Sequence, residues 1–163
     1  MGPRLAKFGL TLAAEKTRIL PFSRHQPPGQ ERFEFLGFEF FWGRDRGGKA
    51  QLKRRTARAK LRASLQRFTH WCRENRQRRL RELFTQVNSK LRGDSQYYGV
   101  HGNSRSLQQF FDGAVRSLLK WLNRRSQRPS YNWQGFTALL EHFKVARPRI
   151  VGYSKRSKAT AMA

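Results

Sequence analysis

The stretch Tyr97-Tyr98-Gly99-Val100-His101-Gly102-Asn103-Ser104-Arg105-Ser106-Leu107 separates two amphipathic and strongly basic helical patterns. Its two glycines permit backbone conformations that other residues resist. The tyrosine pair closes the preceding pattern, and Ser104 or Ser106 is placed to cap a helix that starts near Leu107. The stretch therefore predicts a helix–loop–helix corner that exposes aromatic, asparagine and arginine side chains.

Four patterns of helical period lie around this corner. Apolar residues recur at helical spacing in residues 61–72, 80–91, 107–122 and 133–143, and Asn132 is placed to cap the last of these patterns. Arginine and lysine occupy many of the positions between the apolar ones. Connections of roughly five to fifteen residues suit a compact bundle, so the apolar stripes predict a core rather than ligand sites.

The chain ahead of the helices predicts strands. Aromatic residues alternate with polar or small ones between Phe33 and Trp42, which is typical of a strand. Gly37 in the middle of this run indicates a bend, a bulge or a close approach of some other group to its backbone. Residues 43–48 then form a charged turn, and residues 49–53 return as the second strand of a hairpin.

The two ends of the chain are less regular. Residues 1–22 predict a short helix that ends at Gly9, followed by short strands near residues 10–12 and 19–20. Residues 152–163 have no apolar period, and we expect a disordered basic tail there. The whole sequence predicts an α+β fold that is mostly α, with short strands and a β-hairpin followed by a bundle of about four helices.

Charge restricts the class of partner. The chain has 35 Lys and Arg residues against 10 Asp and Glu residues, a formal net charge of +25, and 13% of its residues are aromatic. Such a chain repels itself unless an anionic partner screens it, and nucleic acid is the usual partner of a folded basic domain. A membrane surface is the second choice, but no apolar run approaches the ~20 residues that a span requires. No signal peptide is recognisable, and the lone Cys72 fits a reducing cytoplasm.

The sequence offers little for metal or nucleophilic chemistry. Metal-dependent phosphoryl chemistry needs clustered carboxylates, whereas Asp45, Asp94 and Asp112 lie in separate segments. The four histidines are far apart, one cysteine cannot build a zinc site, and the glycine-rich loop that binds nucleotide phosphates is absent. We therefore expect no catalytic residue, no metal and no cofactor. His101 in the corner is interpreted as a loop histidine that touches phosphate or solvent.

Binding chemistry is what the composition favours. Arginines interleaved with tyrosine and tryptophan offer phosphate contacts together with flat faces on which bases can stack, a combination found in RNA-binding proteins. Arginine exceeds lysine, which suits bidentate recognition of phosphate. The alternative, that these arginines form only a solubilising shell, stays open from composition alone.

Three stretches in this order resemble one family, the reverse transcriptase/maturase proteins encoded by group II introns. Phe8-Gly9-Leu10-Thr11-Leu12 through Glu15-Lys16-Thr17 is similar to their late palm motif, and Phe33-Glu34-Phe35-Leu36-Gly37-Phe38 to the primer-grip hairpin that follows it. The stretch from Arg92-Gly93 to Leu107 and Phe110 is similar to the maturase-specific helical thumb, or domain X. Arg147-Pro148-Arg149-Ile150-Val151 resembles the segment that closes this region.

The resemblance covers about residues 4–151 and implies a division of the chain. It implies a distal palm remnant with the primer-grip hairpin in residues 1–53, the maturase-specific thumb in residues 54–151, and a tail in residues 152–163. Lys16 matches the late-palm lysine that lies near the incoming nucleotide. The primer-grip-like residues are Phe35, Leu36 and Gly37.

The resemblance further implies that the thumb binds structured intron RNA and supports splicing. The expected RNA contacts lie on the corner, at the end of the third helical pattern and on the first thumb helix: Arg54, Arg55, Arg58, Arg92, Tyr97, Tyr98, Asn103, Arg105, Arg124 and Arg125. The family polymerises DNA on RNA with Mg²⁺ held by aspartates that precede the late palm motif. Because this chain begins close to that motif, we expect no polymerase site of its own.

Two alternatives to an RNA-binding maturase fragment follow from the same resemblance. The chain could be one piece of a split RNA-directed DNA polymerase, active only with a complementary chain that supplies the catalytic palm. It could also be a remnant of a mobile element without a selected activity, in which case a truncated palm would leave apolar surface uncovered. A bacterial-type cytoplasmic location is expected in each case.

Overall fold

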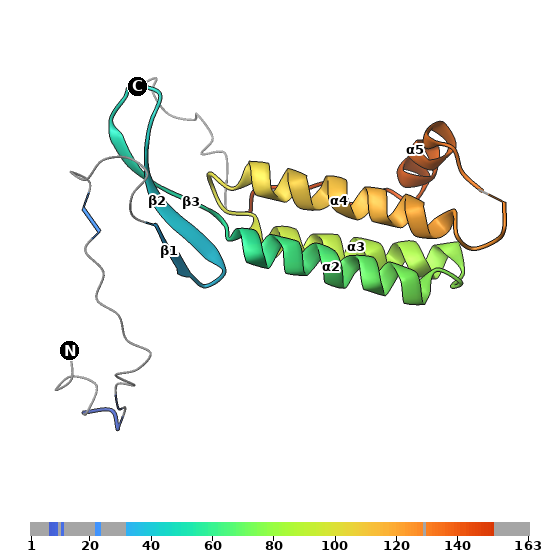
Figure 1. Cartoon of the computed structure of the whole chain (residues 1–163), viewed down its shortest axis with the longest axis horizontal. Coiled ribbons are helices and arrows are strands. Elements are labelled where there is room, and N and C mark those ends of the chain that lie inside the picture. Colours follow the sequence, from blue (N-terminus) through green and yellow to red (C-terminus); the bar gives the residue numbers. More distant parts are fainter. Residues whose placement is uncertain (1–6, 10, 12–21, 24–31, 129, 152–163) are drawn as a thin grey trace, which may run out of the picture.

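A computed structural model describes residues 7–9, 11, 22–23, 32–128 and 130–151. The elements are β1 (Arg32–Phe35), β2 (Phe38–Arg44), β3 (Ala50–Thr56), α2 (Arg58–Asn75), α3 (Leu80–Tyr98), α4 (Ser104–Leu122) and α5 (Trp133–His142). The sheet lies at one end of the three long helices and α5 lies at the other (Figure 1). The predicted α+β, mostly helical fold is confirmed.

The three strands form an antiparallel sheet in the order β1-β2-β3. The predicted irregularity at Gly37 is a complete chain reversal, because Phe35 pairs with Phe38 across a turn of two residues. The turn residues Leu36 and Gly37 have φ values of +49° and +78°, as tight hairpin turns of this kind require. A close approach at Gly37 is also confirmed, since a Cβ there would lie 3.2 Å from the hydroxyl oxygen of Tyr98.

Aromatic rings gather on one side of this sheet. Phe33 and Phe40, which are cross-strand partners, stack with ring centroids 5.1 Å apart. Phe22, from the chain ahead of β1, contacts Phe33 at 4.9 Å and Trp42 at 5.3 Å between centroids. The alternation seen in the sequence therefore produces a stacked aromatic face on a sheet of only three strands.

The sheet passes directly into the first long helix. Ala57 is completely buried between β3 and α2, and its backbone N–H donates to the Gly37 carbonyl oxygen at 2.9 Å. The prediction that Arg54 and Arg55 lie on the first thumb helix is wrong. Both belong to β3, where Arg54 pairs with Phe40 and Arg55 with Glu39, because strand pairing continues to the end of β3 before the helix starts.

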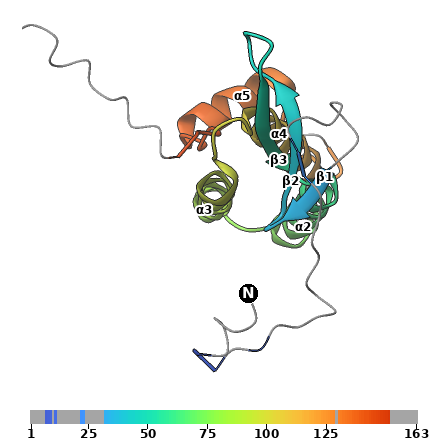
Figure 2. The same ribbon diagram turned by 90° about the vertical axis from the view of Figure 1, so that its left-hand side faces the viewer.

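The long helices pack through their apolar stripes, as predicted. Figure 2 views them from the sheet end, with the strands in front. The buried core takes side chains from all four helices, which are Phe68, Cys72, Leu83, Phe84, Val87, Leu91, Phe110, Ala114, Val115, Leu118, Leu122 and Phe136. Burial raises the pKa of the Cys72 thiol to about 12, so this cysteine is a protonated core residue rather than a nucleophile.

The short helix α5 lies at the far end of the bundle, and Asn123 holds the chain just before it (Figure 1). The Asn123 carboxamide accepts from the backbone N–H groups of Ser130 and Tyr131 and donates to the Tyr131 carbonyl oxygen. Asn132 caps α5 as predicted, with its side chain accepting from the Gly135 N–H at 2.7 Å. These contacts turn the chain back toward the core.

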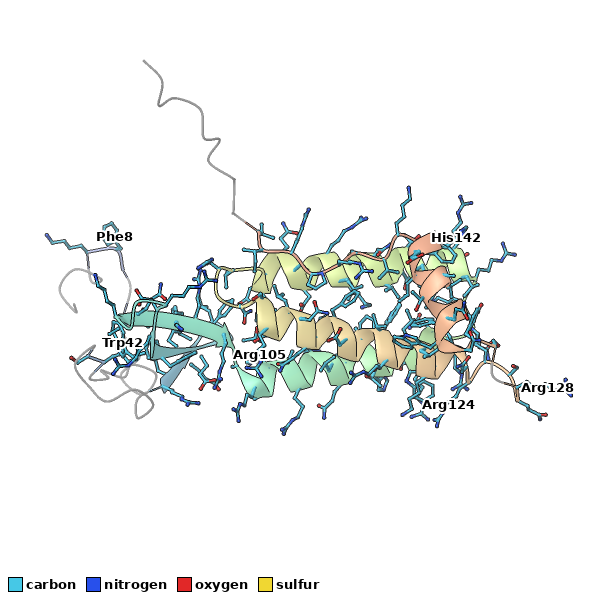
Figure 3. The ribbon with its side chains drawn as sticks, turned by 90° about the horizontal axis from the view of Figure 1, so that it is seen from above. Phe8, Trp42, Arg105, Arg124, Arg128 and His142 are labelled. Atoms are coloured by element: carbon cyan, nitrogen blue, oxygen red, sulfur yellow. The ribbon has the colours of Figure 1, made fainter. Side chains whose placement is uncertain are left out.

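After α5 the chain returns along α3 to the sheet end of the molecule, as a strap formed by residues 143–151 (Figure 3). Phe143 stacks on Phe84 with ring centroids 4.4 Å apart. The Asn88 side-chain amide holds the strap through two hydrogen bonds. Its nitrogen donates to the Phe143 carbonyl, and its oxygen accepts from the Ala146 N–H. The Val151 N–H finally donates to the Gly99 carbonyl oxygen at 2.6 Å.

The start of α4 differs from the prediction. The helix begins at Ser104, with Asn103 in the N-cap position, and neither Ser104 nor Ser106 caps it. Gly9 lies in a turn with φ of +66°, and residue 11 belongs to no strand. The other residues of the strands expected near 10–12 and 19–20, and the tail at 152–163, fall outside the described residues. Lys16 falls outside them as well.

Candidate nucleic-acid interface

A groove of about 810 Å³ lies between β3 and the helices that pack against its end. The edge strand supplies consecutive residues from Gln51 to Thr56. The first turns of α2 add Arg58 and Leu61, and the corner with the start of α4 adds His101, Gly102 and Arg105. Segments about fifty residues apart in the sequence thus build one concave surface.

Positive charge is concentrated in this groove. The basic residues Lys53, Arg54, Arg55, Arg58 and Arg105 are among its lining, and no aspartate or glutamate of the described chain is. The side chains of Arg54, Arg58 and Arg105 are exposed. Cations in a concave surface with low-dielectric walls attract an anionic ligand more strongly than the same cations on a flat surface.

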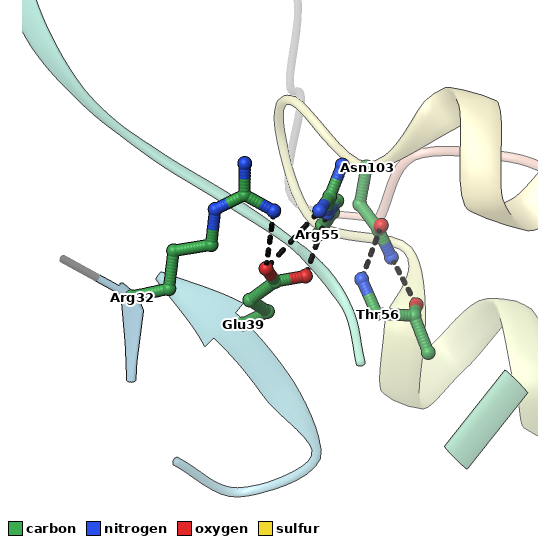
Figure 4. Close-up of polar contacts among 5 residues, drawn as sticks. All are labelled: Arg32, Glu39, Arg55, Thr56 and Asn103. Carbon is green, nitrogen blue, oxygen red and sulfur yellow. Dashed lines mark hydrogen bonds and ion pairs between the residues drawn. The ribbon is translucent and has the colours of Figure 1, made fainter. Parts of the chain in front are cut away.

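Arg55 differs from its neighbours because it has a carboxylate partner. Its guanidinium donates to Glu39 through Nε at 2.7 Å and through Nη2 at 3.1 Å, and Arg32 donates to the same carboxylate at 3.1 Å (Figure 4). The hydrogen bond from Arg55 is the main reason that the pKa of Glu39 lies below its ordinary value. Arg55 is therefore a fixed, partly neutralised wall of the groove, and its ring contact with Phe41 at 5.1 Å adds to this.

The shape of the groove depends on one buried amide. Asn103 is fully buried and forms two hydrogen bonds with Thr56, accepting from its N–H at 2.8 Å and donating to its hydroxyl at 2.8 Å (Figure 4). It also donates to the Tyr98 carbonyl at 2.9 Å. These bonds clamp the corner to the end of β3. The prediction of Asn103 as an RNA contact is therefore wrong, because the side chain has no surface to offer and acts as a positioning residue.

The two tyrosines of the corner pack on the sheet rather than lining the groove. Tyr97 donates its hydroxyl hydrogen to the Leu36 carbonyl at 3.0 Å, and Tyr98 lies edge-on to Phe38 with centroids 5.4 Å apart. Burial is the main reason that the pKa of Tyr98 is raised. Both residues thus hold the end of α3 on the β1–β2 turn, although about half of the Tyr97 side chain, 54%, stays exposed.

The remaining predicted contacts lie outside this groove. Arg92 is exposed on α3, and Arg124 is exposed at the far end of α4, opposite to Arg105 (Figure 3). Arg125 is only partly exposed, and its guanidinium donates to the carbonyl oxygens of Arg76 and Arg78. It therefore closes the α2–α3 connection, and burial lowers its pKa. We assign Arg125 a structural role in place of the predicted RNA contact.

The primer-grip-like residues form the exposed tip of the β1–β2 hairpin. Phe35 is 59% exposed and Leu36 is 67% exposed, so the tip of the hairpin presents apolar surface. Gly37 completes the turn beneath Tyr98. This tip and the basic groove belong to different parts of the sheet, since none of these three residues lines the groove.

The groove also contains polar residues that are not among the predicted RNA contacts. Lys53 lies two residues before Arg55 and therefore on the same side of β3, and Gln109 lies one helical turn after Arg105. Residues two apart in a strand, such as Lys53 and Arg55, share a face, and so do residues four apart in a helix, such as Arg105 and Gln109. These spacings are the signals in the sequence that could have identified Lys53 and Gln109. They could be used only once the strand and helix boundaries were known.

Among the described residues, no group of three or more His, Cys, Asp or Glu side chains could hold a metal ion, and no helix is long and apolar enough to cross a membrane. The arrangement instead offers donors for phosphate oxygens.

Comparisons of the chain with models of protein families, with curated proteins and with solved structures gave no match.

Proposed function

We propose that the chain binds RNA through the groove between β3 and the corner, as the C-terminal part of a group II intron reverse transcriptase/maturase. The observation that carries this proposal is the convergence of Arg54, Arg58 and Arg105 from a strand and two helices on one concave surface. The resemblance of three sequence stretches, in the order found in that family, supports the choice of structured intron RNA as the partner.

The groove suits a phosphate backbone because its donors are held by rigid elements. The Asn103 clamp and the Glu39–Arg55 pair fix the walls, so only the exposed guanidinium groups lose conformational entropy on binding. Arginine at these positions can donate two parallel hydrogen bonds to one phosphate. Binding of intron RNA in this groove would hold the RNA against both the sheet and the helices, which is how we expect the protein to support splicing.

The first experiment measures the affinity of the purified protein for a structured group II intron RNA and for an unrelated structured RNA of equal length, across a salt series. Phosphate contacts alone weaken with salt equally on both RNAs, with a logarithmic slope of about −0.7 to −0.9 for each contact. A preference for the intron that persists at high salt supports the proposal. Equal and steeply salt-dependent binding would mean a basic remnant without recognition.

Variants locate the binding surface. The groove variant combines Arg54→Ala, Arg58→Ala and Arg105→Ala, and the surface variant combines Arg46→Ala, Arg81→Ala and Arg147→Ala, which are exposed residues outside the groove. Both lose three positive charges. We expect the groove variant alone to lose at least tenfold in affinity and to reduce the salt slope by about 2 to 3. Equal losses in the two variants would contradict the assignment.

One observation favours a second candidate function, that of one piece of a split RNA-directed DNA polymerase. The exposed Phe35 and Leu36 at the hairpin tip form apolar surface suited to a complementary chain. Adding a chain that carries the catalytic palm should then produce cDNA from a primed RNA template. A Leu36→Asp variant should abolish that synthesis while leaving RNA binding by the isolated chain unchanged.

A further inference from the structure

Four positive charges surround one tryptophan at the end of the bundle farthest from the sheet. The Trp121 ring lies 5.4 Å from the Arg124 guanidinium carbon, 5.6 Å from that of Arg76, 5.9 Å from that of Arg73 and 5.7 Å from Lys120 Nζ. We call these four cations and the ring the Trp121 cluster. They come from the C-terminal ends of α2 and α4 and the residues that directly follow them, so the packing of these two helices creates the cluster.

The charges in the Trp121 cluster are not compensated within the described chain. The described ion pairs involve only Glu39 and Glu74, and neither contacts these four cations. Because each cation lies within 6 Å of the same ring, no two of them are more than about 12 Å apart, which is close to the Debye length of ~10 Å at 0.1 M salt. The cations therefore repel one another, and an anion placed among them would relieve that repulsion.

A second groove connects the Trp121 cluster to the first groove, which lies between β3 and the corner. It has a volume of about 800 Å³, and Arg62, Thr69, Arg73 and Trp121 are among its lining. Arg58, Leu61 and Gln109 line both grooves, so the concave surface continues along the seam between α2 and α4. The seam has this form because the two helices approach closely, with the Thr69 and Ser117 hydroxyls 2.8 Å apart.

The basic residues of α2 that line the seam are separated by close to whole helical turns. Arg58, Arg62 and Arg73 are separated by four and eleven residues, that is by about one and three helical turns, which places them on one face of α2. Arg58 and Arg73 are separated by about 23 Å along the helix axis at ~1.5 Å per residue. Stacked nucleotides that advance about 3.4 Å each along the axis of the strand would need about seven steps to cover that distance.

We propose that the Trp121 cluster is a second phosphate-binding site and that one RNA strand occupies it together with the first groove, passing along the α2–α4 seam. This inference rests on RNA binding by the first groove as proposed above and extends it to a defined length. Phosphate oxygens accept from Arg73, Lys120 and Arg124, while the Trp121 ring holds the cations in place from beneath. RNA long enough to span the seam gains contacts that a short RNA cannot make.

Length-dependent binding tests the proposal. The cluster variant combines Arg73→Ala, Lys120→Ala and Arg124→Ala, and it is compared with the groove and surface variants on oligouridylates of about four and about sixteen nucleotides. Thermal unfolding checks that each variant is folded. We expect the cluster variant to bind the short RNA as the unchanged protein does, to lose about tenfold or more in affinity for the long RNA, and to reduce its salt slope by about 2 to 3.

The outcomes separate this inference from the proposed function. If the groove variant loses both RNAs while the cluster variant matches the surface variant on the long RNA, the second site is wrong and the first stands. If the cluster variant loses both RNAs while the groove variant retains them, RNA binds at Trp121 without the seam, and the joint path is wrong. If all three variants behave alike, both assignments fail.

Discussion

At the scale of single residues, the structure separates side chains that shape the basic groove from side chains that offer charge to it. Asn103, Arg125 and the two corner tyrosines were expected on the surface, but their hydrogen bonds hold the sheet, the corner and the α2–α3 connection together. Arg54, Arg58 and Arg105 keep exposed guanidinium groups. Substitutions in the first set should change stability, and those in the second should change affinity.

Asn103→Ala should destabilise the fold by about 2–4 kcal/mol, because it leaves the Thr56 N–H, the Thr56 hydroxyl and the Tyr98 carbonyl without their buried partner. Thr56→Val removes only one of the three hydrogen bonds, and we expect a loss of about 1 kcal/mol. Urea unfolding followed by circular dichroism measures both. A loss for Asn103→Ala no larger than that for Thr56→Val would show that the clamp does not hold the corner.

Asp94 should make the free energy of unfolding decrease as the pH rises, which is the opposite of a carboxylate whose pKa is lowered in the folded state. Burial on α3 raises its pKa to about 6. Below its unfolded pKa of about 4 the group is protonated in both states. Between about pH 4 and pH 6 only the folded state keeps the proton, so this contribution falls as the pH rises, and above pH 6 the penalty is constant.

Asp94→Asn should therefore stabilise the protein at pH 7 by on the order of 1–2 kcal/mol and have little effect at pH 4. Denaturant midpoints at the two pH values measure the difference. Glu141→Gln, on an exposed position of α5, is the matched control and should not show this pattern. Equal effects of Asp94→Asn at both pH values would rule out a raised pKa as the cause.

At the scale of elements, a side chain would fit at Gly93 within α3 but not at Gly99, the C-cap of that helix. A Cβ at Gly93 meets no atom within 4 Å, whereas a Cβ at Gly99 would lie 2.0 Å from the Ser95 carbonyl oxygen and 2.6 Å from that of Arg149. Gly99 has a negative φ of −73°, so contact, and not a left-handed backbone, requires glycine there. The strap can approach the end of α3 only because this residue has no side chain.

Gly93→Ala should stabilise α3 by about 0.5–1 kcal/mol, the ordinary gain of alanine over glycine within a helix. Gly99→Ala should destabilise the protein by about 2 kcal/mol or more, because backbone atoms cannot move as freely as a flexible side chain. Hydrogen exchange of the Val151 amide reports on release of the strap. Retained protection of that amide in Gly99→Ala would contradict the assigned contact.

Elements with a clear period were predictable, and the junctions between them were not. The apolar stripes of the four helices and the cap at Asn132 follow from spacing and side-chain chemistry, which are local properties. The end of β3 depends on pairing with Phe38 and Glu39 in another strand, so Arg54 and Arg55 were assigned to the wrong element. Asn103 resembles an N-cap residue in the sequence, and only the fold shows that Thr56 competes for its side chain.

At the scale of the whole molecule, the excess of 25 positive charges opposes compaction. Each described ion pair contains Glu39 or Glu74, so most of the basic side chains have no carboxylate to offset them within the described chain. Folding therefore relies on the apolar core and on the clamps between elements. Screening by salt or by a bound polyanion should strengthen the fold.

The unfolding temperature should rise by several degrees between low and moderate salt, and sulfate should raise it more than chloride at equal ionic strength because it also binds cation clusters. Differential scanning calorimetry in sodium chloride and sodium sulfate measures this. The cluster variant, which has fewer charges to screen, should show a smaller rise. An unfolding temperature independent of salt would mean that charge repulsion contributes little to stability.

The strap also affects the order in which contacts can form during folding. Its contacts join Asn88 to Ala146 and Gly99 to Val151, pairs that are 58 and 52 residues apart in the chain. Contacts across such separations form late, since the entropy of closing the intervening chain must be overcome first. During synthesis, residues 143–151 also leave the ribosome after all four helices. The side of α3 that the strap covers is therefore open in every shorter nascent chain, and we expect it to close only after residues 143–151 have been synthesised.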